Sequence, residues 1–308
     1  MSTETARRHA AGSAATRDSY YGRPVIKPPV WKPDIAIYLF SGGLAGASAT
    51  LAAAARRAGN DRLARSANLT AGVAVSVSPV LLIHDLGRPA RFLNMLRVVK
   101  PTSPMNLGSW LLTAEGTASG IASACELLGV LPRLRNGAER IAGGLGPLLA
   151  TYTGVLVADT AVPVWHEARH ELPVLFAGGA AASAGAAGML LTRPRDAGPA
   201  RRLLLAGAAV EEVASAVMER RLGELGDPYR NGPAGRFART ARTLTLAGAT
   251  LGAVAGRRRT AAGIGGALTL AGALCRRFAV YEAGFQSARD PRATVEPQRR
   301  RLRERGAA

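Results

Sequence analysis

The chain has 308 residues, which is enough for one large domain or two domains of average size. Apolar residues make up 48% of the chain but aromatic residues only 5%, a composition that favours helices over β-sheets. The formal net charge is +19, yet the arginines are spread across almost every gap between apolar segments. Cations that flank apolar segments suit membrane lipid headgroups better than they suit DNA, so we expect no nucleic-acid partner.

The two cysteines, Cys125 and Cys275, lie inside apolar segments, and the sequence contains no CxxC or CxxCH pattern. An iron–sulfur cluster usually takes four thiolates, so the chain is not expected to hold a cluster or a c-type haem by itself. A b-type haem would need facing histidines within apolar segments, and only His84 lies near one. We therefore expect no haem, no iron–sulfur cluster and no metal site in this chain.

The N-terminal residues 1–33 are polar and contain several prolines, so we expect a tail without a long helix. They include no apolar core of a cleavable signal peptide, which leaves the first apolar segment as the insertion signal. Trp31 and Lys32 directly precede that segment, where interfacial anchors of membrane proteins are found.

Eight apolar segments follow, each close to the ~20 residues that a helix needs to cross a bilayer. They cover residues 34–55, 66–86, 107–130, 141–163, 172–192, 200–219, 236–256 and 260–284. We expect an all-α, polytopic protein of the cell membrane, with eight transmembrane helices in two four-helix bundles over residues 34–284. A basic C-terminal tail is expected over residues 285–308. Small residues such as Gly42, Gly43 and Gly46 would let the helices approach closely.

A soluble, alanine-rich helical protein is the alternative to a membrane location. The segment 172–192 argues against it, because this segment contains no charged residue. A helix on the surface of a soluble protein needs a polar face, and this segment has none.

The longest polar interruption lies between the second and third segments, at residues 84–110. Asp85, Arg88 and Arg91 stand near its start, and Asn106 follows two prolines near its end. A charged connector that is stiffened by proline between two apolar spans is typical of a docking surface at a membrane boundary. We assign Asp85, Arg88, Arg91 and Asn106 to the docking of a partner.

A charged residue inside a span costs roughly 2.5–3.5 kcal/mol on insertion scales unless it is paired or hydrated, so such residues are candidates for function. Glu115 lies in the third segment. In the fourth, Tyr152 and Asp159 are seven residues apart, about two turns, and would share one helix face. A phenol and a carboxylate on one face suit a ligand with hydroxyl or carbonyl groups, and its protons. Asp159 could equally cap or pair locally near the end of its segment.

A second group of charges lies in the sixth and eighth segments. The sixth contains Glu211, Glu212 and Glu219, with Ser215 on the same face. The eighth closes with Arg276, Arg277, Tyr281 and Glu282. These residues indicate either a proton path or a structural ion-pair network.

Residues His166 to His170 spell HExxH, the pattern of zinc metalloproteases. The pattern needs a helix, so that both histidines share a face and the glutamate can act as a base. Here it stands between Pro163 and Pro173, which leaves room for only a short helix, and no histidine follows as a third ligand. An intramembrane metalloprotease is therefore a weak alternative.

Six short motifs are spread along the chain: YLFSGGLAG from Tyr38, DLGRPARF from Asp85, PTSPMNLGSW from Pro101, YTGVL from Tyr152, PVW from Pro163 and LPxLF from Leu172. In these motifs the chain resembles the NrfD/PsrC family, the membrane subunits of polysulfide-reductase-like molybdoenzyme complexes. The resemblance covers roughly residues 30–290, and DLGRP with PTSPM is its most specific signal.

The resemblance implies an eight-helix protein without haem that binds a quinone, expected to be menaquinone. It implies a ferredoxin-like iron–sulfur (4Fe-4S) subunit docked on one face and a molybdopterin catalytic subunit beyond it. Electrons would pass between that subunit and the quinone pool, as in anaerobic respiration. The connector at residues 84–110 would lie on the side of the termini, where the partner docks.

The resemblance also suggests site residues. Tyr152 matches the family's tyrosine on the fourth span, and Asp34 is a counterpart of polar residues at the start of the first. A family histidine in the first span has no match, because Ile37 and Tyr38 occupy that region. We therefore predict quinone binding by Asp34, Tyr38 and Tyr152.

Catalytic roles are assigned to Tyr152, Asp159 and Glu115, with Tyr152 on a quinone carbonyl and the carboxylates handling protons. The chain would be a quinone-reactive subunit of an oxidoreductase without the catalytic centre of the complex. The alternative from another class is a proton- or ion-translocating module without its own redox site, using Glu115, Asp159 and Glu212.

Overall fold

The computed structural model describes residues 25–295 and residue 306, and this part of the chain contains helices and no strand. The predicted all-α class is therefore confirmed. Among the described residues, eight helices have 20 or more residues: α2 (Asp34–Arg57), α3 (Asp61–Leu86), α5 (Pro104–Leu128), α6 (Pro132–Ala158), α8 (Leu172–Leu191), α9 (Gly198–Leu222), α11 (Gly232–Ala255) and α12 (Arg259–Arg289). Four shorter elements connect them: α4 (Pro89–Met95), α7 (Pro163–Glu167), the 3-10 helix η1 (Gly223–Gly226) and α10 (Asp227–Arg230).

Local sequence explains where these helices begin. The Asn60 side chain accepts a hydrogen bond of 3.2 Å from the Leu63 N–H and caps α3. Proline occupies the first turn of α5 and α6, where its missing N–H removes no helical hydrogen bond. Because α6 starts at Pro132, the gap between the third and fourth predicted segments, residues 131–140, is almost wholly helical. Similarly, α12 continues to Arg289, past the predicted start of the C-terminal tail.

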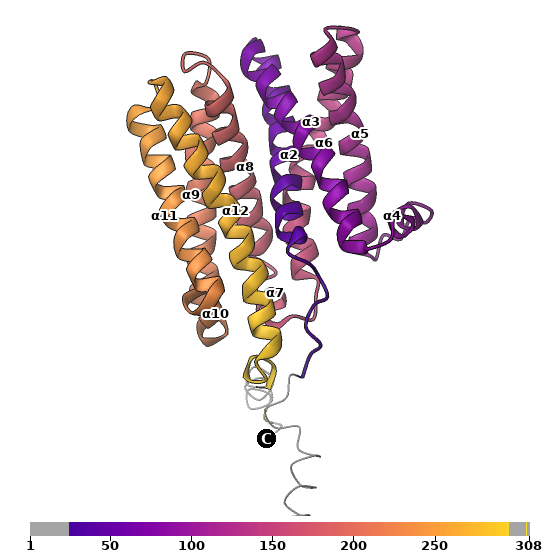
Figure 1. Ribbon diagram of the computed structural model, residues 1–308, viewed down its shortest axis with the longest axis vertical. Coiled ribbons are helices and arrows are strands. Elements are labelled where there is room, and N and C mark those ends of the chain that lie inside the picture. The colour runs from indigo at the N-terminus through magenta and orange to yellow at the C-terminus, as the bar shows by residue number, and fades with distance from the viewer. Residues whose placement is uncertain (1–24, 296–305, 307–308) are drawn as a thin grey trace, which may run out of the picture.

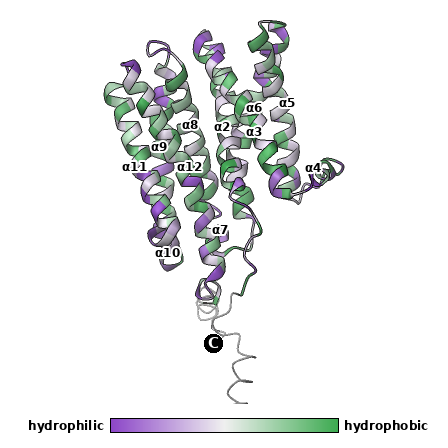
Figure 2. Cartoon of the chain, in the orientation of Figure 1, coloured by the Kyte–Doolittle hydropathy of each residue, from purple (hydrophilic) through white to green (hydrophobic). Residues whose placement is uncertain are grey.

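Four of the helices in the described part of the chain, α2, α3, α6 and α8, are long and apolar enough to cross a membrane. Exposed apolar side chains on these helices, including Val73 and Val80 of α3 and Ile141 of α6, would face lipid favourably. Hydrophilic residues gather toward the ends of the helices (Figure 2). The fold thus has the hydropathy pattern of a multi-pass membrane protein.

Helix α2 occupies the centre of the arrangement and packs against α3, α6, α8 and α12 (Figure 1). Helix α5 packs against α6 and α3 on one side of it. On the other side α9 packs against α8, and α11 packs against α12. The first turn of α2 and the last turn of α12 lie at the same end of the molecule (Figure 1).

Small residues allow α2 and α6 to come into backbone contact, as the glycine pattern of the first span predicted. A Cβ atom placed on Gly46 would lie only 2.4 Å from the carbonyl oxygen of Gly146. Thr50 adds polar contacts at the same crossing, because its hydroxyl donates to the carbonyls of Gly46 and Gly143 at 3.0 and 3.2 Å. This approach is typical of transmembrane helix packing.

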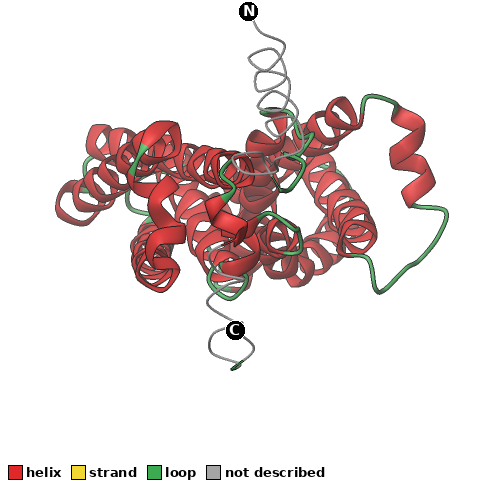
Figure 3. Ribbon diagram, turned by 90° about the horizontal axis from the view of Figure 1, so that it is seen from below, coloured by secondary structure: helices red, strands yellow, loops and turns green. Residues whose placement is uncertain are grey.

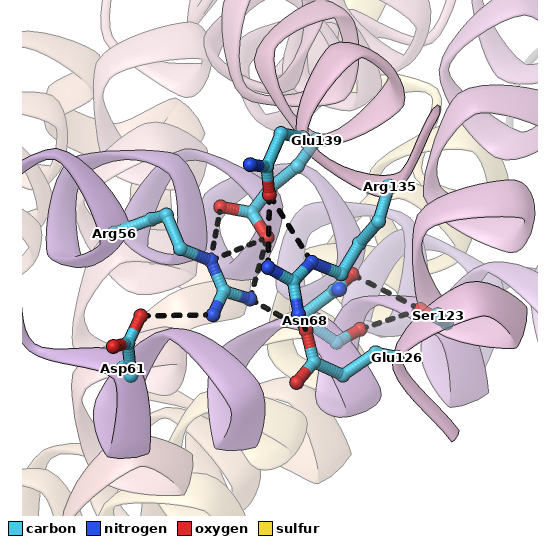
Figure 4. Close-up of polar contacts among 8 residues, drawn as sticks. Arg56, Asp61, Asn68, Ser123, Glu126, Arg135 and Glu139 are labelled. Carbon is cyan, nitrogen blue, oxygen red and sulfur yellow. Dashed lines mark hydrogen bonds and ion pairs between the residues drawn. The ribbon is translucent and has the colours of Figure 1, made fainter. Parts of the chain in front are cut away.

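At the end opposite to the start of α2, an ion-pair network joins α2, α3, α5 and α6 (Figure 4). Arg56 is its centre: the guanidinium contacts Asp61 at 3.1 Å, Glu126 at 2.5 Å and Glu139 at 3.0 Å. Arg135 pairs with Glu126 from the other side at 3.3 Å. Glu126 and Glu139 are almost inaccessible to solvent, with side-chain exposures of 8% and 3%. Arg56 therefore neutralises two carboxylates that have little access to water.

We expect Arg56→Ala to lower the free energy of unfolding by about 3 kcal/mol or more, because it leaves two buried carboxylates without their main partner. Thermal unfolding of the detergent-purified protein, followed by circular dichroism, measures the change. Arg57→Ala is the matched control, since Arg57 is the exposed neighbour on the same helix. Equal destabilisation by the two substitutions would contradict this role of Arg56.

Candidate functional site

The predicted tyrosine, Tyr152, lies near the end of α6 and covers a glycine of α5. A Cβ atom on Gly108 would be 1.8 Å from the ring carbon Cζ of Tyr152, so the phenol occupies the space that a side chain would need. Thr153, next in the chain, packs against Gly42 of α2, where a Cβ atom would approach to 3.6 Å. In the described part of the chain, the Tyr152 hydroxyl makes no hydrogen bond to the protein.

Glu115 lies seven residues after Gly108 on α5, which is about 10 Å or two turns along the same face. Its side chain is completely buried, with an exposure of 0%. The Ser119 hydroxyl donates to Glu115 Oε1 at 2.7 Å, while Oε2 has no hydrogen-bond partner among the described residues. A buried carboxylate oxygen of this kind usually meets a polar ligand or water.

The start of α2 places two further predicted residues near this region. Tyr38 is buried, with an exposure of 2%, and lies one turn before Gly42. Asp34, in the first turn of α2, pairs with Nδ1 of His84 at 2.9 Å. His84 stands near the end of α3, so the structure brings an imidazole to the start of the first span, where the sequence of α2 has none. Sequence reasoning missed this role of His84, because the two residues are far apart in the chain.

Asp159 does not lie where the sequence predicted. Helix α6 ends at Ala158, and Asp159 is an exposed residue beyond it, so it does not share a helix face with Tyr152 inside the bundle. Asp159 instead lines an open cavity of about 430 Å³ together with Thr160, His166 and Glu167. A second cavity of about 430 Å³ lies between α8 and α9 and is lined mainly by valines. Tyr38 and Tyr152 line neither of these two cavities.

The part of the connector between α3 and α5, which contains α4, projects sideways from the other helices (Figure 3). Arg88 and Arg91 are exposed, as a docking surface requires, and Arg91 donates to the Leu86 carbonyl at 2.9 Å. Asp85 accepts a hydrogen bond of 2.7 Å from the backbone N–H of Lys32, which ties the connector to the N-terminal segment.

Asn106 turns inward instead of presenting its side chain to a partner. It is buried, its Oδ1 accepts from the Lys100 N–H at 2.7 Å, and its Nδ2 donates to the carbonyls of Met95 and Val98 at 2.5 and 2.9 Å. Asn106 therefore shapes the connector from within, and any docking contact of this surface falls to its exposed residues.

The HExxH stretch does not form the helix that a metalloprotease needs. Helix α7 ends at Glu167, so His166 and His170 do not share a continuous helix face. Across the described residues, no group of three or more His, Cys, Asp or Glu side chains is placed to hold a metal ion. The neighbouring Glu171 pairs instead with Arg221 at the end of α9, at 2.5 Å. The stretch therefore belongs to a structural junction between α7, α8 and α9.

The three charges of the ion-translocation alternative lie on, or just beyond, different helices and are not in direct contact with one another. Glu115 lies on α5, Asp159 beyond the end of α6, and Glu212 on α9, where it pairs with Arg276 at 2.5 Å. No hydrogen bond or ion pair joins them among the residues that the structure describes.

The apolar helices and their close packing define a multi-pass helical membrane protein. The family profile of polysulphide reductase, NrfD, matches residues 25–202, which is more than half of the chain. The chain therefore belongs to the NrfD family, whose members are membrane subunits that assemble with oxidoreductase subunits. The match extends over α2 to α8 and reaches only the start of α9. Among curated proteins, none matches the chain.

Gly108→Ala should lower the free energy of unfolding by about 1–3 kcal/mol and displace the Tyr152 ring, because the new methyl group overlaps the phenol. Thermal unfolding in detergent measures the effect. Gly120→Ala on the same helix is the control, since a Cβ atom placed there would have no neighbour within 4 Å, and it should stay within about 1 kcal/mol of the wild type. A stable Gly108→Ala protein would show that Tyr152 is free to leave this position.

The stability contributed by the Glu171–Arg221 pair, at the junction between α8 and α9, should decrease at low pH. Partial burial alone would raise the pKa of the Glu171 carboxyl, but the hydrogen bonds and charge of Arg221 outweigh it and hold that pKa below its usual range. A lowered pKa means that Glu171 stabilises the fold fully above the unfolded carboxyl pKa of about 4.3, and that this contribution is lost as the pH falls through the folded value.

We therefore expect Glu171→Gln to have a lower melting temperature than the wild type at neutral pH. The difference in melting temperature between the two proteins should become smaller as the pH falls. Melting curves recorded from neutral pH to about pH 3 test this. The exposed Glu224→Gln is the control. A gap between wild type and Glu171→Gln that does not change with pH would refute the role of the carboxylate charge.

Proposed function

We propose that this chain is the quinone-reactive membrane subunit of a molybdopterin oxidoreductase complex. It exchanges electrons between a quinone, of the menaquinone type, and an iron–sulfur partner subunit. The observation that carries the proposal is the position of Tyr152, whose ring covers Gly108 while its hydroxyl has no protein partner among the described residues. Membership of the NrfD family supports the assembly with oxidoreductase subunits.

We further propose that all eight long helices cross the cell membrane, as two four-helix bundles formed by α2, α3, α5 and α6 and by α8, α9, α11 and α12. Four of these helices are apolar enough to span by themselves. Of the other four, α5, α9 and α12 pack along them and α11 packs along α12, which supports a common direction across the bilayer.

The polar groups around Tyr152 fit a quinone, whose two carbonyl oxygens accept hydrogen bonds and whose reduction takes up protons. When bound, the quinone supplies the two-electron, two-proton redox chemistry. Tyr152 donates a hydrogen bond that orients the ligand, and Tyr38 lines the site from α2. Glu115 holds and releases a proton through its unpartnered Oε2. The Asp34–His84 pair, which is partly exposed, exchanges protons with solvent.

The docking surface follows from the same arrangement. Asp85, Arg88 and Arg91 lie at the end of α3 and the start of α4, next to the start of α2. The iron–sulfur subunit binds there, at the end of the molecule where Tyr152 lies, which keeps the electron-transfer distance short. Asn106 maintains the shape of this surface from inside.

Tyr152→Phe should keep the protein folded but abolish saturable binding of a fluorescent quinol analogue, because the phenyl ring preserves the packing on Gly108 and lacks the donor. Fluorescence quenching during titration of the detergent-purified protein measures binding. Thr151→Val removes the neighbouring hydroxyl on the same helix and should bind like the wild type, since that hydroxyl is used by the Pro147 carbonyl.

Equal affinity of Tyr152→Phe and the wild type would remove Tyr152 from the site. If neither protein binds the analogue although both are helical and monodisperse, the site is incomplete in the isolated subunit.

A further inference from the structure

A fully buried charge cluster lies between α8, α9 and α12, apart from the region around Tyr152. Its centre is Glu211 of α9, with an exposure of 0%. Arg276 Nε and Arg277 Nη1 of α12 each lie 3.9 Å from Glu211 Oε1, beyond hydrogen-bond distance. In the described part of the chain neither carboxylate oxygen has a hydrogen-bond partner, and Arg276 Nε, Arg277 Nε and Arg277 Nη1 also lack one.

The surrounding helices hold these groups in place. Gly179 of α8 makes room for the carboxylate, because a Cβ atom there would lie 2.5 Å from Glu211 Oε1. Arg277 donates to the Phe176 carbonyl at 3.0 Å and stacks over the Phe176 ring at 3.9 Å. The guanidinium is thereby fixed by α8 and cannot close onto Glu211. Buried polar atoms that are held apart in this way are normally bridged by water.

A ladder of polar side chains runs from this cluster along α9. Arg276 Nη1 donates to the Ser215 hydroxyl at 3.1 Å, and Ser215 donates to Glu219 Oε1 at 3.1 Å. Positions 211, 215 and 219 are one turn apart, so the ladder covers about 12 Å of the helix. Glu219 is partly exposed and lies beside Tyr229 of α10. Helix α10 lies toward the end of the molecule where α12 finishes (Figure 1).

On the other side of Glu211, toward the start of α9, the backbones of α8 and α9 are in close contact. A Cβ atom on Gly207 of α9 would lie 2.3 Å from the Ala182 nitrogen of α8, and one on Gly185 would lie 2.4 Å from the Leu204 nitrogen. Leu204 and Ala208 are buried, with exposures of 0% and 3%. Two helices in backbone contact leave no space for a chain of water molecules.

We propose that Glu211 is a proton-binding site that exchanges protons through water with one end of the molecule only, the end at Glu219 and α10. A carboxylate oxygen of Glu211 takes up one proton that enters past Glu219 and Ser215, and the proton leaves by the same route. The site stores a proton and does not pass it across the bundle. It lies beyond residue 202, where the family match ends, and it does not depend on quinone binding.

The charged groups that act directly on Glu211 are Arg276 and Arg277 of α12 and Glu212 of α9. Farther from Glu211, Arg242 of α11 pairs with Glu212, and Tyr229 of α10 lies near Glu219 and Arg276. Helix α8 carries no charged residue. On α9 itself Glu212 pairs with Arg276 at 2.5 Å, whereas the carboxylate nearest to Arg277 is that of Glu211, at 3.9 Å.

Infrared difference spectra of the purified protein between two pH values, in H₂O and in D₂O, test the proposal. We expect a carboxyl band that shifts in D₂O, is missing in Glu211→Gln and is unchanged in Glu224→Gln, an exposed control. Glu219→Gln should keep the band but slow its appearance after a pH jump at least several-fold. If Glu211→Gln does not fold, the charge-balanced pair Glu211→Gln with Arg277→Gln replaces it.

The proposal is overturned if the wild type shows no such band within the pH range of the folded protein. It is also overturned if the band persists when Glu211 is replaced, in the single or the paired variant. An unchanged rate in Glu219→Gln would overturn the proposed route. Quinol binding is measured separately from the infrared bands, so the proton-binding site and the quinone site can each be refuted without affecting the other.

Discussion

Buried charges need partners, and this constraint determines much of how the helices of this protein are joined. Arg56 brings together carboxylates from α3, α5 and α6, and Arg276 and Arg277 connect α12 with α9 and α8. Both sets lie in a chain whose core consists largely of alanine and glycine, which pack closely but offer little directional preference. The ion pairs supply that preference, because a buried charge that loses its partner costs about 3–5 kcal/mol.

Two buried polar regions inside the helical domain, one around Tyr152 and Glu115 and one around Glu211, differ in the arrangement of their polar groups. Around Tyr152 and Glu115 the polar atoms are few, and Glu115 Oε2 has no hydrogen-bond partner among the described residues, which fits the ligand with carbonyl groups proposed above. Around Glu211 several charged groups of both signs lie close together. Two guanidinium groups are nevertheless held just beyond hydrogen-bond distance from the Glu211 carboxylate. The first arrangement can select a ligand, whereas the second is suited to water and protons.

The N-terminal segment shows how residues distant in sequence complete the end of the molecule where the partner is proposed to dock. Trp31 stacks on Trp165 with ring centroids 5.3 Å apart, and its carbonyl accepts a hydrogen bond of 2.7 Å from Tyr281. The next residue, Lys32, contacts Asp85 and the His84 carbonyl. The segment thus connects α3, α7 and α12, and it fixes the connector relative to the second half of the domain.

Local patterns were sufficient to predict the helical class, the approximate extents of eight long helices, the close approach at Gly46 and the family, because apolar periodicity, small residues and short motifs are local properties. They also placed Tyr152 and Glu115 correctly inside helices. The end of α6 before Asp159, the inward orientation of Asn106 and the contact of His84 with Asp34 became visible in the folded chain alone. These outcomes depend on contacts between residues that are distant in sequence, and a local sequence pattern does not show which distant residue a side chain will contact.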